Sequence, residues 1–269
     1  MNSSCIPYFD ANPRRPRSLA ASVRNGLSLP LALLLALLLG GCANNEEERT
    51  VVTDITEAYE LARSSVGRGN YRRGIDIYEA IQARYPFSDL ARQIQLELMY
   101  AYYKAGQKEL AIETAETFIR ENPIHPRVDY ALYMQALSYF EDEPGFLERW
   151  FRRDTTRRPP KEVELSYVTL RRLVERYPAS SYAADAQQRM IYLRNRLAAY
   201  ENHVADYYLR LGAYVAAINR ARRAVEEYNG ADSTAQSLKT MANAYERLGL
   251  VDLASDTRRV LATNYPNES

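Results

Sequence analysis

Small and apolar residues recur at fixed spacings from about residue 53 to the end of the chain, inside stretches that are typical of helices. Each stretch closes on a similar short motif. The closing motifs are Tyr85-Pro86, Asn122-Pro123, Tyr177-Pro178, Tyr228-Asn229-Gly230 and Tyr265-Pro266. A proline stops a helix from continuing, so these motifs separate successive helices. No alternating pattern of strands is present in the sequence, which predicts an all-α protein.

Counting back from each closing motif reveals a repeat. A small or apolar residue is followed three positions later by Tyr, then by Gly at a turn, and five positions after that by Ala. The clearest copies carry Met99, Tyr102, Gly106 and Ala111; Ala205, Tyr208, Gly212 and Ala217; and Ala242, Tyr245, Gly249 and Ala254, while a looser first copy has Ala62, Ser65, Gly69 and Gly74. This spacing matches the tetratricopeptide unit of 34 residues. We predict a tetratricopeptide-repeat solenoid of about five helix-turn-helix repeats. Ser88, Ser180 or Ser181, and Ser233 or Thr234 lie where the N-caps of the next helices belong.

The third copy departs from this period. It starts at Ala136, but its second helix begins near Glu162, about 18 residues late, which defines an insert at residues 141–160. The insert holds an apolar and basic cluster made of Trp150, Phe151, Arg152 and Arg153. Such a cluster is typical of an interface loop for a protein partner or for lipid headgroups. The alternative is that the aromatic rings fold back on the repeats and the arginines are solvated, and the sequence leaves both open.

A second departure is the stretch from Ser181 to Leu211, which contains neither Pro nor Gly. It is about 17 residues longer than a repeat helix, so we predict one long helix. This helix would join an N-terminal block of three repeats, residues 53–178, to a C-terminal block of two repeats within residues 179–269.

An apolar run of about 13 residues, Leu27 to Leu39, ends in Gly40-Gly41-Cys42. A membrane-spanning helix needs about 20 residues, so the run is typical of a signal peptide. The motif resembles the lipobox of bacterial lipoproteins, which implies cleavage after residue 41, acylation of Cys42 and attachment by lipid alone. Ala43 and Asn44 favour the outer membrane, and residues 42–52 form a polar tether. A start at Val23 would give a shorter signal peptide.

The charge balance and the reactive residues of the sequence argue against several classes of function. Residues 1–41 hold four arginines and one aspartate, so the remainder has 31 basic and 33 acidic residues and a net charge near −2. This balance argues against nucleic acid as the main partner. His125 and His203 show no metal-ligand spacing, and the sequence contains no phosphate loop or nucleophile motif. Acidic residues such as Glu97 and Glu164 are better explained as solvated helix faces than as a catalytic pair, so we expect no enzyme activity, cofactor or metal.

Several runs resemble the BamD family, lipoproteins of the outer-membrane β-barrel assembly (BAM) machinery. These runs are Arg84 to Phe87, Gln95 to Lys104, Asn122 to Pro126, Val204 to Tyr208 and Ala217 to Arg220. The resemblance covers nearly the whole chain after Cys42. This chain departs from the family at Arg157-Arg158-Pro159, where Arg-Asp-Pro is usual, and at Asn229-Gly230, where Tyr-Pro is usual.

The resemblance implies a non-enzymatic scaffold on the periplasmic face of the outer membrane. Its implied partners are a periplasmic domain of BamA, other BAM lipoproteins and unfolded outer-membrane proteins. The N-terminal repeats would present a groove, for which the candidates are Tyr59, Tyr100, Tyr103 and Tyr133. The C-terminal repeats would hold BamA. We expect Arg220, with Arg222 and Arg223, to pair with a carboxylate of BamA; the alternative is that Arg220 is a solvated helix residue.

Two other functions remain open at this stage. A tetratricopeptide lipoprotein of a pilus or cell-wall machine would share the lipobox and the repeats, but not the Tyr-Pro-Phe and Asn-Pro-x-His-Pro runs. A murein hydrolase is the alternative from the enzyme class.

Overall fold

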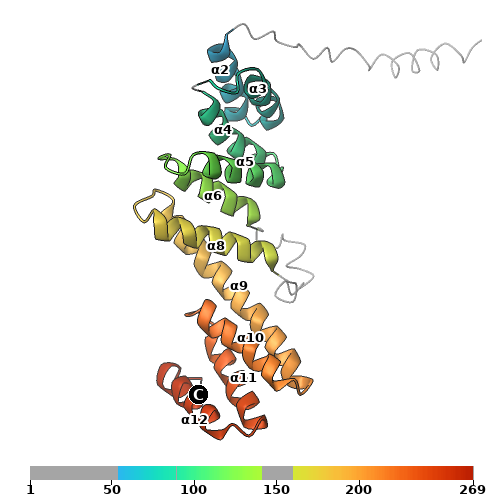
Figure 1. Ribbon diagram of the computed structural model, residues 1–269, viewed down its shortest axis with the longest axis vertical. Helices are drawn as coiled ribbons and strands as arrows, with labels where there is room; N and C mark the ends of the chain where they lie inside the picture. Colours follow the sequence, from blue (N-terminus) through green and yellow to red (C-terminus); the bar gives the residue numbers. More distant parts are fainter. Residues whose placement is uncertain (1–53, 89, 141–159, 269) are drawn as a thin grey trace, which may run out of the picture. The chain divides into compact units, whose positions relative to one another are not determined.

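The computed structural model describes residues 54–88, 90–140 and 160–268 (Figure 1). The chain divides into two units, residues 1–51 and 52–269, and all described residues belong to the second. Within these ranges the chain forms ten α-helices and no strand. The helices are α2 (Ile55–Gly67), α3 (Tyr71–Arg84), α4 (Ala91–Lys104), α5 (Lys108–Glu121), α6 (Val128–Tyr139), α8 (Lys161–Arg176), α9 (Ala183–Arg210), α10 (Tyr214–Glu227), α11 (Thr234–Arg247) and α12 (Val251–Asn264).

The helices pack as five consecutive pairs: α2 with α3, α4 with α5, α6 with α8, α9 with α10, and α11 with α12. The second helix of each pair also packs on the first helix of the next pair, and α4 packs on α6 as α9 does on α11. Helix α9 has 28 residues, twice the 14 of its partner α10. The predicted fold class is therefore confirmed: five helix-turn-helix repeats with one long helix.

Small residues mark the places where paired helices approach each other. Ala111, Ala205 and Ala217 are fully buried. At Gly74 on α3, an added Cβ would lie 2.4 Å from Cγ2 of Val66 on α2, closer than two carbon atoms can come. A larger side chain at these positions would force the helices apart, which explains why the repeat keeps them small.

The turns between repeats differ in part from our expectation for Ser88, Ser180 and Ser233. The helices that follow these serines have no hydrogen bond from a side chain at their N-caps. Instead, the N–H of Ser88 donates to the Tyr85 carbonyl (3.1 Å) and the N–H of Ala91 donates to the Ser88 carbonyl (3.0 Å). The same two bonds recur in the turns that begin at Asn122, Tyr177 and Tyr228. Ser233 is the N-cap residue of α11, as predicted, whereas Leu90 and Tyr182 are the N-caps of α4 and α9. A capping side chain is not required, because the backbone of the turn already pairs the first amide of the helix.

The buried apolar residues form two large clusters and two small ones. One large cluster fills the first two repeats around Tyr78, Ile94 and Leu98. The other extends from α4 to α10 and includes Leu193 and Leu197 of α9. Because the second cluster contains residues of both predicted blocks, α9 joins them through a shared core as well as through the chain.

Candidate functional site

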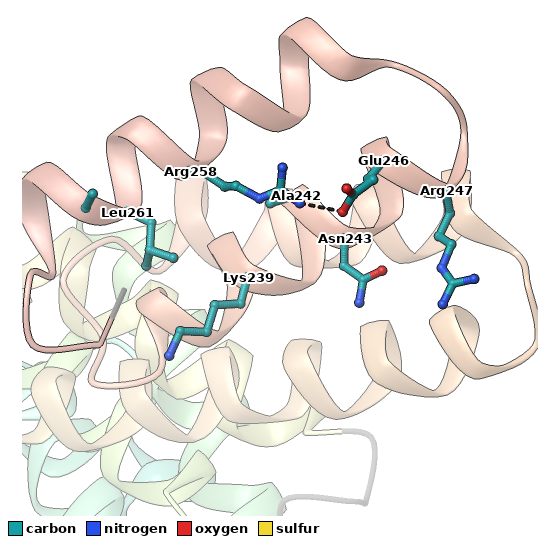
Figure 2. Close-up of a pocket in the computed structure, with 8 residues that line it drawn as sticks. Lys239, Ala242, Asn243, Glu246, Arg247, Arg258 and Leu261 are labelled. Carbon is teal, nitrogen blue, oxygen red and sulfur yellow. Dashed lines mark hydrogen bonds and ion pairs between the residues drawn. The ribbon is translucent and has the colours of Figure 1, made fainter.

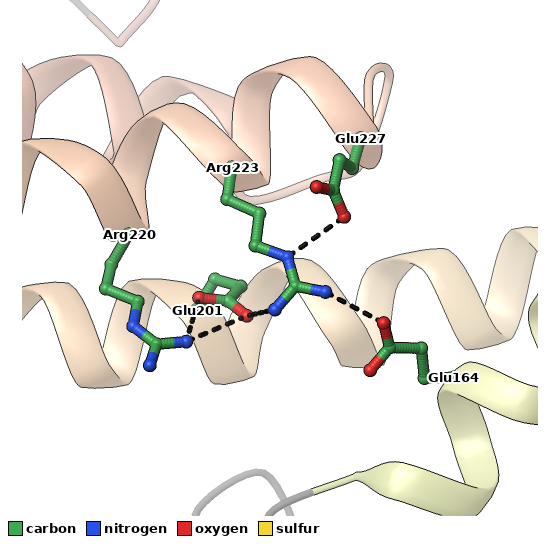
Figure 3. Close-up of polar contacts among 5 residues, drawn as sticks. All are labelled: Glu164, Glu201, Arg220, Arg223 and Glu227. Atoms are coloured by element: carbon green, nitrogen blue, oxygen red, sulfur yellow. Dashed lines mark hydrogen bonds and ion pairs between the residues drawn. The ribbon is translucent and has the colours of Figure 1, made fainter.

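A cluster of charged side chains links α8, α9 and α10 (Figure 3). Glu201 lies on α9, and Nη1 of Arg220 on α10 is 3.2 Å from its Oε2. Nη1 of Arg223, also on α10, is 3.1 Å from Oε1 of the same carboxylate. Arg223 also reaches Glu164 at the start of α8 through Nη2 (2.8 Å) and Glu227 through Nε (2.9 Å). We call these five residues the Glu201 cluster.

The members of the Glu201 cluster differ in how far they are buried, and this difference decides which charge needs a partner. The Glu201 side chain is 3% exposed, whereas those of Arg220 and Arg223 are 39% and 32% exposed. A buried carboxylate must be paired, because removing its partner leaves a charge that water cannot reach. The hydrogen bond to Glu227, together with the charge of Glu201, raises the pKa of Arg223 although burial acts in the opposite direction.

Each nitrogen of the Arg223 guanidinium donates to a different carboxylate, so all three nitrogens of this residue have a partner within the molecule. Arg220 differs, because only its Nη1 makes a hydrogen bond within the described residues. Figure 3 shows the other terminal nitrogen of Arg220 pointing away from Glu201. The structure therefore places Arg220 at the edge of the cluster, with donors left for another molecule.

The structure separates Arg222 from the other two predicted arginines. Arg222 is exposed and hydrogen-bonds Asn219 on its own helix. Residues two positions apart on a helix do not share a face, whereas Arg220 and Arg223 are three apart and do. Of the three predicted arginines, Arg220 and Arg223 therefore face α9, and Arg222 does not.

Our sequence analysis missed the role of Glu201. A signal was present, because Glu201 lies four residues after Leu197 and four before Ala205, both of which are buried. This spacing puts the carboxylate on the buried face of α9. A charged residue on such a face needs a partner, and the next helix along the chain, α10, carries three arginines that could supply it.

The four tyrosines predicted to line a groove all lie on first helices of repeats. Tyr59 is on α2, Tyr100 and Tyr103 are on α4, and Tyr133 is on α6. The hydroxyl of Tyr59 lies 3.4 Å from Oε1 of Glu97 on α4. Tyr100 is 37% exposed, while Tyr103 packs against both large core clusters. Tyr59, Tyr103 and Tyr133 are half-buried, so all four rings are accessible at least in part, and Tyr103 differs from the others in contacting both clusters.

Tyr133 belongs to a second polar and aromatic group at the start of α9. Its ring stacks on Tyr182 with centroids 4.7 Å apart, and its hydroxyl donates to Oδ2 of Asp185 (2.7 Å). Arg189 pairs with the same oxygen at 2.6 Å. Burial would raise the pKa of Asp185, but hydrogen bonds from Arg189 and Tyr133 outweigh it and lower that pKa. Burial and the bond to Asp185 raise the pKa of Tyr133 to about 12. Sequence analysis missed the partners of Tyr133 because they follow about 50 residues later.

Some predicted residues lie outside the described ranges: Cys42, Trp150, Phe151, Arg152 and Arg153. Among the residues that are described, no group of three His, Cys, Asp or Glu side chains could hold a metal ion. In the same part of the chain, every helix is too short or too polar to cross a lipid bilayer.

Comparison with known proteins gives one consistent result. The sequence model of the YfiO family, described as an outer membrane lipoprotein, matches residues 53–261. The chain is 39% identical over 241 residues to the outer membrane protein assembly factor BamD of Neisseria meningitidis serogroup A, covering 88% of this chain and 90% of that one. The protein of the same name from Neisseria gonorrhoeae is 40% identical, covering 89% of this chain and 90% of its own length.

A relative from another genus shows the same likeness. The outer membrane protein assembly factor BamD of Vibrio cholerae is 38% identical over 237 residues, covering 87% of this chain and 97% of that one. The family match spans most of the repeats, and these relatives align over most of both chains. The chain therefore belongs to the YfiO family of outer membrane lipoproteins, together with the outer membrane protein assembly factors BamD.

Proposed function

We propose that this protein is a non-enzymatic scaffold of the outer-membrane β-barrel assembly machinery. It binds a periplasmic domain of BamA and other BAM lipoproteins, and it receives unfolded outer-membrane proteins before they insert. Family membership supports the role in outer-membrane protein assembly. The contact with BamA rests on the geometry of Arg220.

Arg220 is suited to bind a carboxylate of a partner. Glu201 holds one nitrogen of its guanidinium, which limits the side chain to few conformations before binding. The remaining donors make no hydrogen bond within residues 160–268 and the other described ranges, and the side chain is 39% exposed. A planar guanidinium with free donors pairs well with a carboxylate, and losing one member of a buried interfacial pair costs about 2–5 kcal/mol.

The test compares binding of the isolated periplasmic domain of BamA that adjoins its barrel to three versions of the full chain. Arg220→Met keeps the aliphatic part of the side chain and leaves Glu201 paired with Arg223. We expect at least about tenfold weaker binding, which corresponds to about 1.4 kcal/mol. Arg72→Met removes the same charge from an exposed position on α3 and serves as the matched control.

Isothermal titration calorimetry measures the affinities, and circular dichroism melts show whether each variant is folded. Equal affinity of the unmodified chain and Arg220→Met would rule out the proposed contact. Equal weakening by Arg72→Met would show that net charge rather than this site governs binding.

We further propose that the protein is held on the periplasmic face of the outer membrane by lipid on Cys42. No other segment identified in the sequence is suited to anchor it, and a chain held by several acyl groups stays attached. Cys42→Ser should abolish labelling by radioactive palmitate and leave either an uncleaved precursor or a periplasmic protein. Recovery of this variant in outer-membrane fractions of cells that lack the BAM partners would contradict the lipid anchor.

A further inference from the structure

The last repeat contains a pocket that the proposed contact with BamA does not use (Figure 2). It lies between α11 and α12 and encloses about 850 Å³. The floor of the pocket consists of the apolar side chains of Ala242 and Leu261, which are only 4% and 6% exposed. Its remaining lining residues are mostly polar or charged: Lys239, Asn243, Glu246, Arg247, Arg258 and Ala262.

Three of these residues form a row on one face of α11. Lys239, Asn243 and Arg247 are spaced by four positions, and Figure 2 shows their side chains pointing to the same side of the helix. Two cationic groups therefore flank an amide group above an apolar floor. This combination of a few polar groups around an apolar surface is typical of a ligand-binding site.

The charges of the pocket are not balanced from within. Arg258 pairs with Glu246, and Nζ of Lys239 is 3.8 Å from Oε2 of Glu268 near the chain end. Arg247 makes no ion pair or hydrogen bond with its side chain within the described residues, and Asn243 makes none with its amide group. Arg247 is therefore the one lining cation without an acidic partner among the described residues, and the ion pair of Lys239 is long and exposed, which favours an acidic ligand.

The spacing of the row defines the ligand more closely. Lys239 and Arg247 are eight residues apart, which is about 12 Å along a helix. Each cation can therefore take a carboxylate of its own. In an extended peptide, residues i and i+4 are about 13 Å apart, and residues i, i+2 and i+4 point to one side. An acidic residue at i and another at i+4 would therefore face Lys239 and Arg247, with residue i+2 near Ala242 at the middle of the row.

We propose that this pocket binds an extended segment of a protein partner with the pattern acidic-x-apolar-x-acidic. The two acidic side chains pair with Lys239 and Arg247, and the apolar side chain between them contacts Ala242. The Asn243 amide can donate to a peptide carbonyl and accept from a peptide N–H, as backbone recognition requires. The site is separate from Arg220 and does not depend on binding of BamA.

The experiment uses the full chain and a fluorescein-labelled peptide, Ser-Glu-Ser-Leu-Ser-Glu-Ser, followed by fluorescence anisotropy. We expect binding that weakens as salt increases. Arg247→Glu should weaken it at least about tenfold. Arg259→Glu makes the same charge change at an exposed site on α12 outside the pocket and should leave the affinity unchanged. Arg220→Met should also have no effect.

Two further peptides separate the contributions of charge and apolar contact. Replacing both Glu of the peptide by Gln should weaken binding by about tenfold or more, and replacing Leu by Ser should weaken it several-fold. If Arg247→Glu alters the melting curve, Arg247→Gln provides the test, because it removes the charge without adding another. No binding at about 1 mM chain, or equal weakening by Arg247→Glu and Arg259→Glu, would overturn the proposal.

Discussion

The buried carboxylate of Glu201 is the shared partner of two arginine side chains. It is 3% exposed, and two arginines rather than one balance its charge. Either arginine can keep the carboxylate paired when the other is lost by mutation. The unfavourable state arises only when both are absent, because an uncompensated buried charge costs about 3–5 kcal/mol.

This arrangement predicts non-additive effects on stability. Arg220→Met and Arg223→Met should each lower the free energy of unfolding by about 1–2 kcal/mol. Together they should cost about 2 kcal/mol more than the sum, because the second change removes the last partner of Glu201. Urea unfolding followed by circular dichroism measures these energies.

A third substitution supplies the control for this cycle. Glu201→Gln, added to the double variant, should recover most of the extra loss because the amide carries no charge. Additive effects of the two arginine changes, or no recovery with Gln, would show that burial of the Glu201 charge does not dominate.

At the scale of elements, the first helices of the repeats carry the predicted groove. Tyr59, Tyr100 and Tyr133 lie on α2, α4 and α6, and acidic groups at Glu97 and Asp185 hold two of the hydroxyls. Tyr100 packs edge-on against Tyr71 at 6.4 Å and has no hydrogen bond of its own among the described residues. Of the four candidates, it is therefore the one whose ring is most available to a ligand.

Tyr100→Ala should reduce binding of a urea-unfolded outer-membrane barrel protein, diluted from denaturant, by about fivefold. This corresponds to about 1 kcal/mol for one partly buried aromatic contact. Tyr207→Ala removes a ring that is 51% exposed on α9 and serves as the control. Surface plasmon resonance measures both affinities. If the two variants bind as the unmodified chain does, the face formed by α2, α4 and α6 does not receive unfolded protein through Tyr100.

At the scale of the whole described unit, stability is distributed over four apolar clusters instead of one central core. Tyrosines take part in several of them. Burial raises the pKa of Tyr133 and Tyr228 to about 12, and it also raises the pKa of Tyr78, Tyr102 and Tyr130. The folded chain therefore keeps these phenols neutral at pH values where the unfolded chain ionises them.

This predicts unfolding at alkaline pH. A group whose pKa is raised by folding contributes its full stability below the unfolded value, about 10 for tyrosine, and loses it as the pH approaches the folded value. Each such tyrosine can lower stability by up to about 1.4 kcal/mol per pH unit above pH 10. The urea midpoint should be nearly constant from pH 7 to about 9 and fall steeply between about 10 and 12. A constant midpoint up to pH 12, or phenolate absorbance from all tyrosines near pH 10 in the folded chain, would contradict this.

Much of the fold followed from local sequence alone. Small residues at the helix contacts, proline after four of the five second helices, and glycine at positive φ, as in Gly249 (φ 75°), each meet a backbone or packing constraint within about 34 residues. The absence of Pro and Gly between Ser181 and Leu211 likewise predicted the long α9. These features depend on neighbours in sequence, so a periodic pattern reveals them.

The tertiary structure alone decided which side chains meet. Glu164, Glu201 and Arg223 come from three helices, and the position of α8 against α10 depends on how the repeats stack. The same holds for Tyr133 and Asp185, which are 52 residues apart. Side-chain pairing between helices depends on the rotation and stacking of each repeat, which the repeat pattern does not specify. The pattern therefore determined the helices and their order, while packing determined the partners of the buried charges.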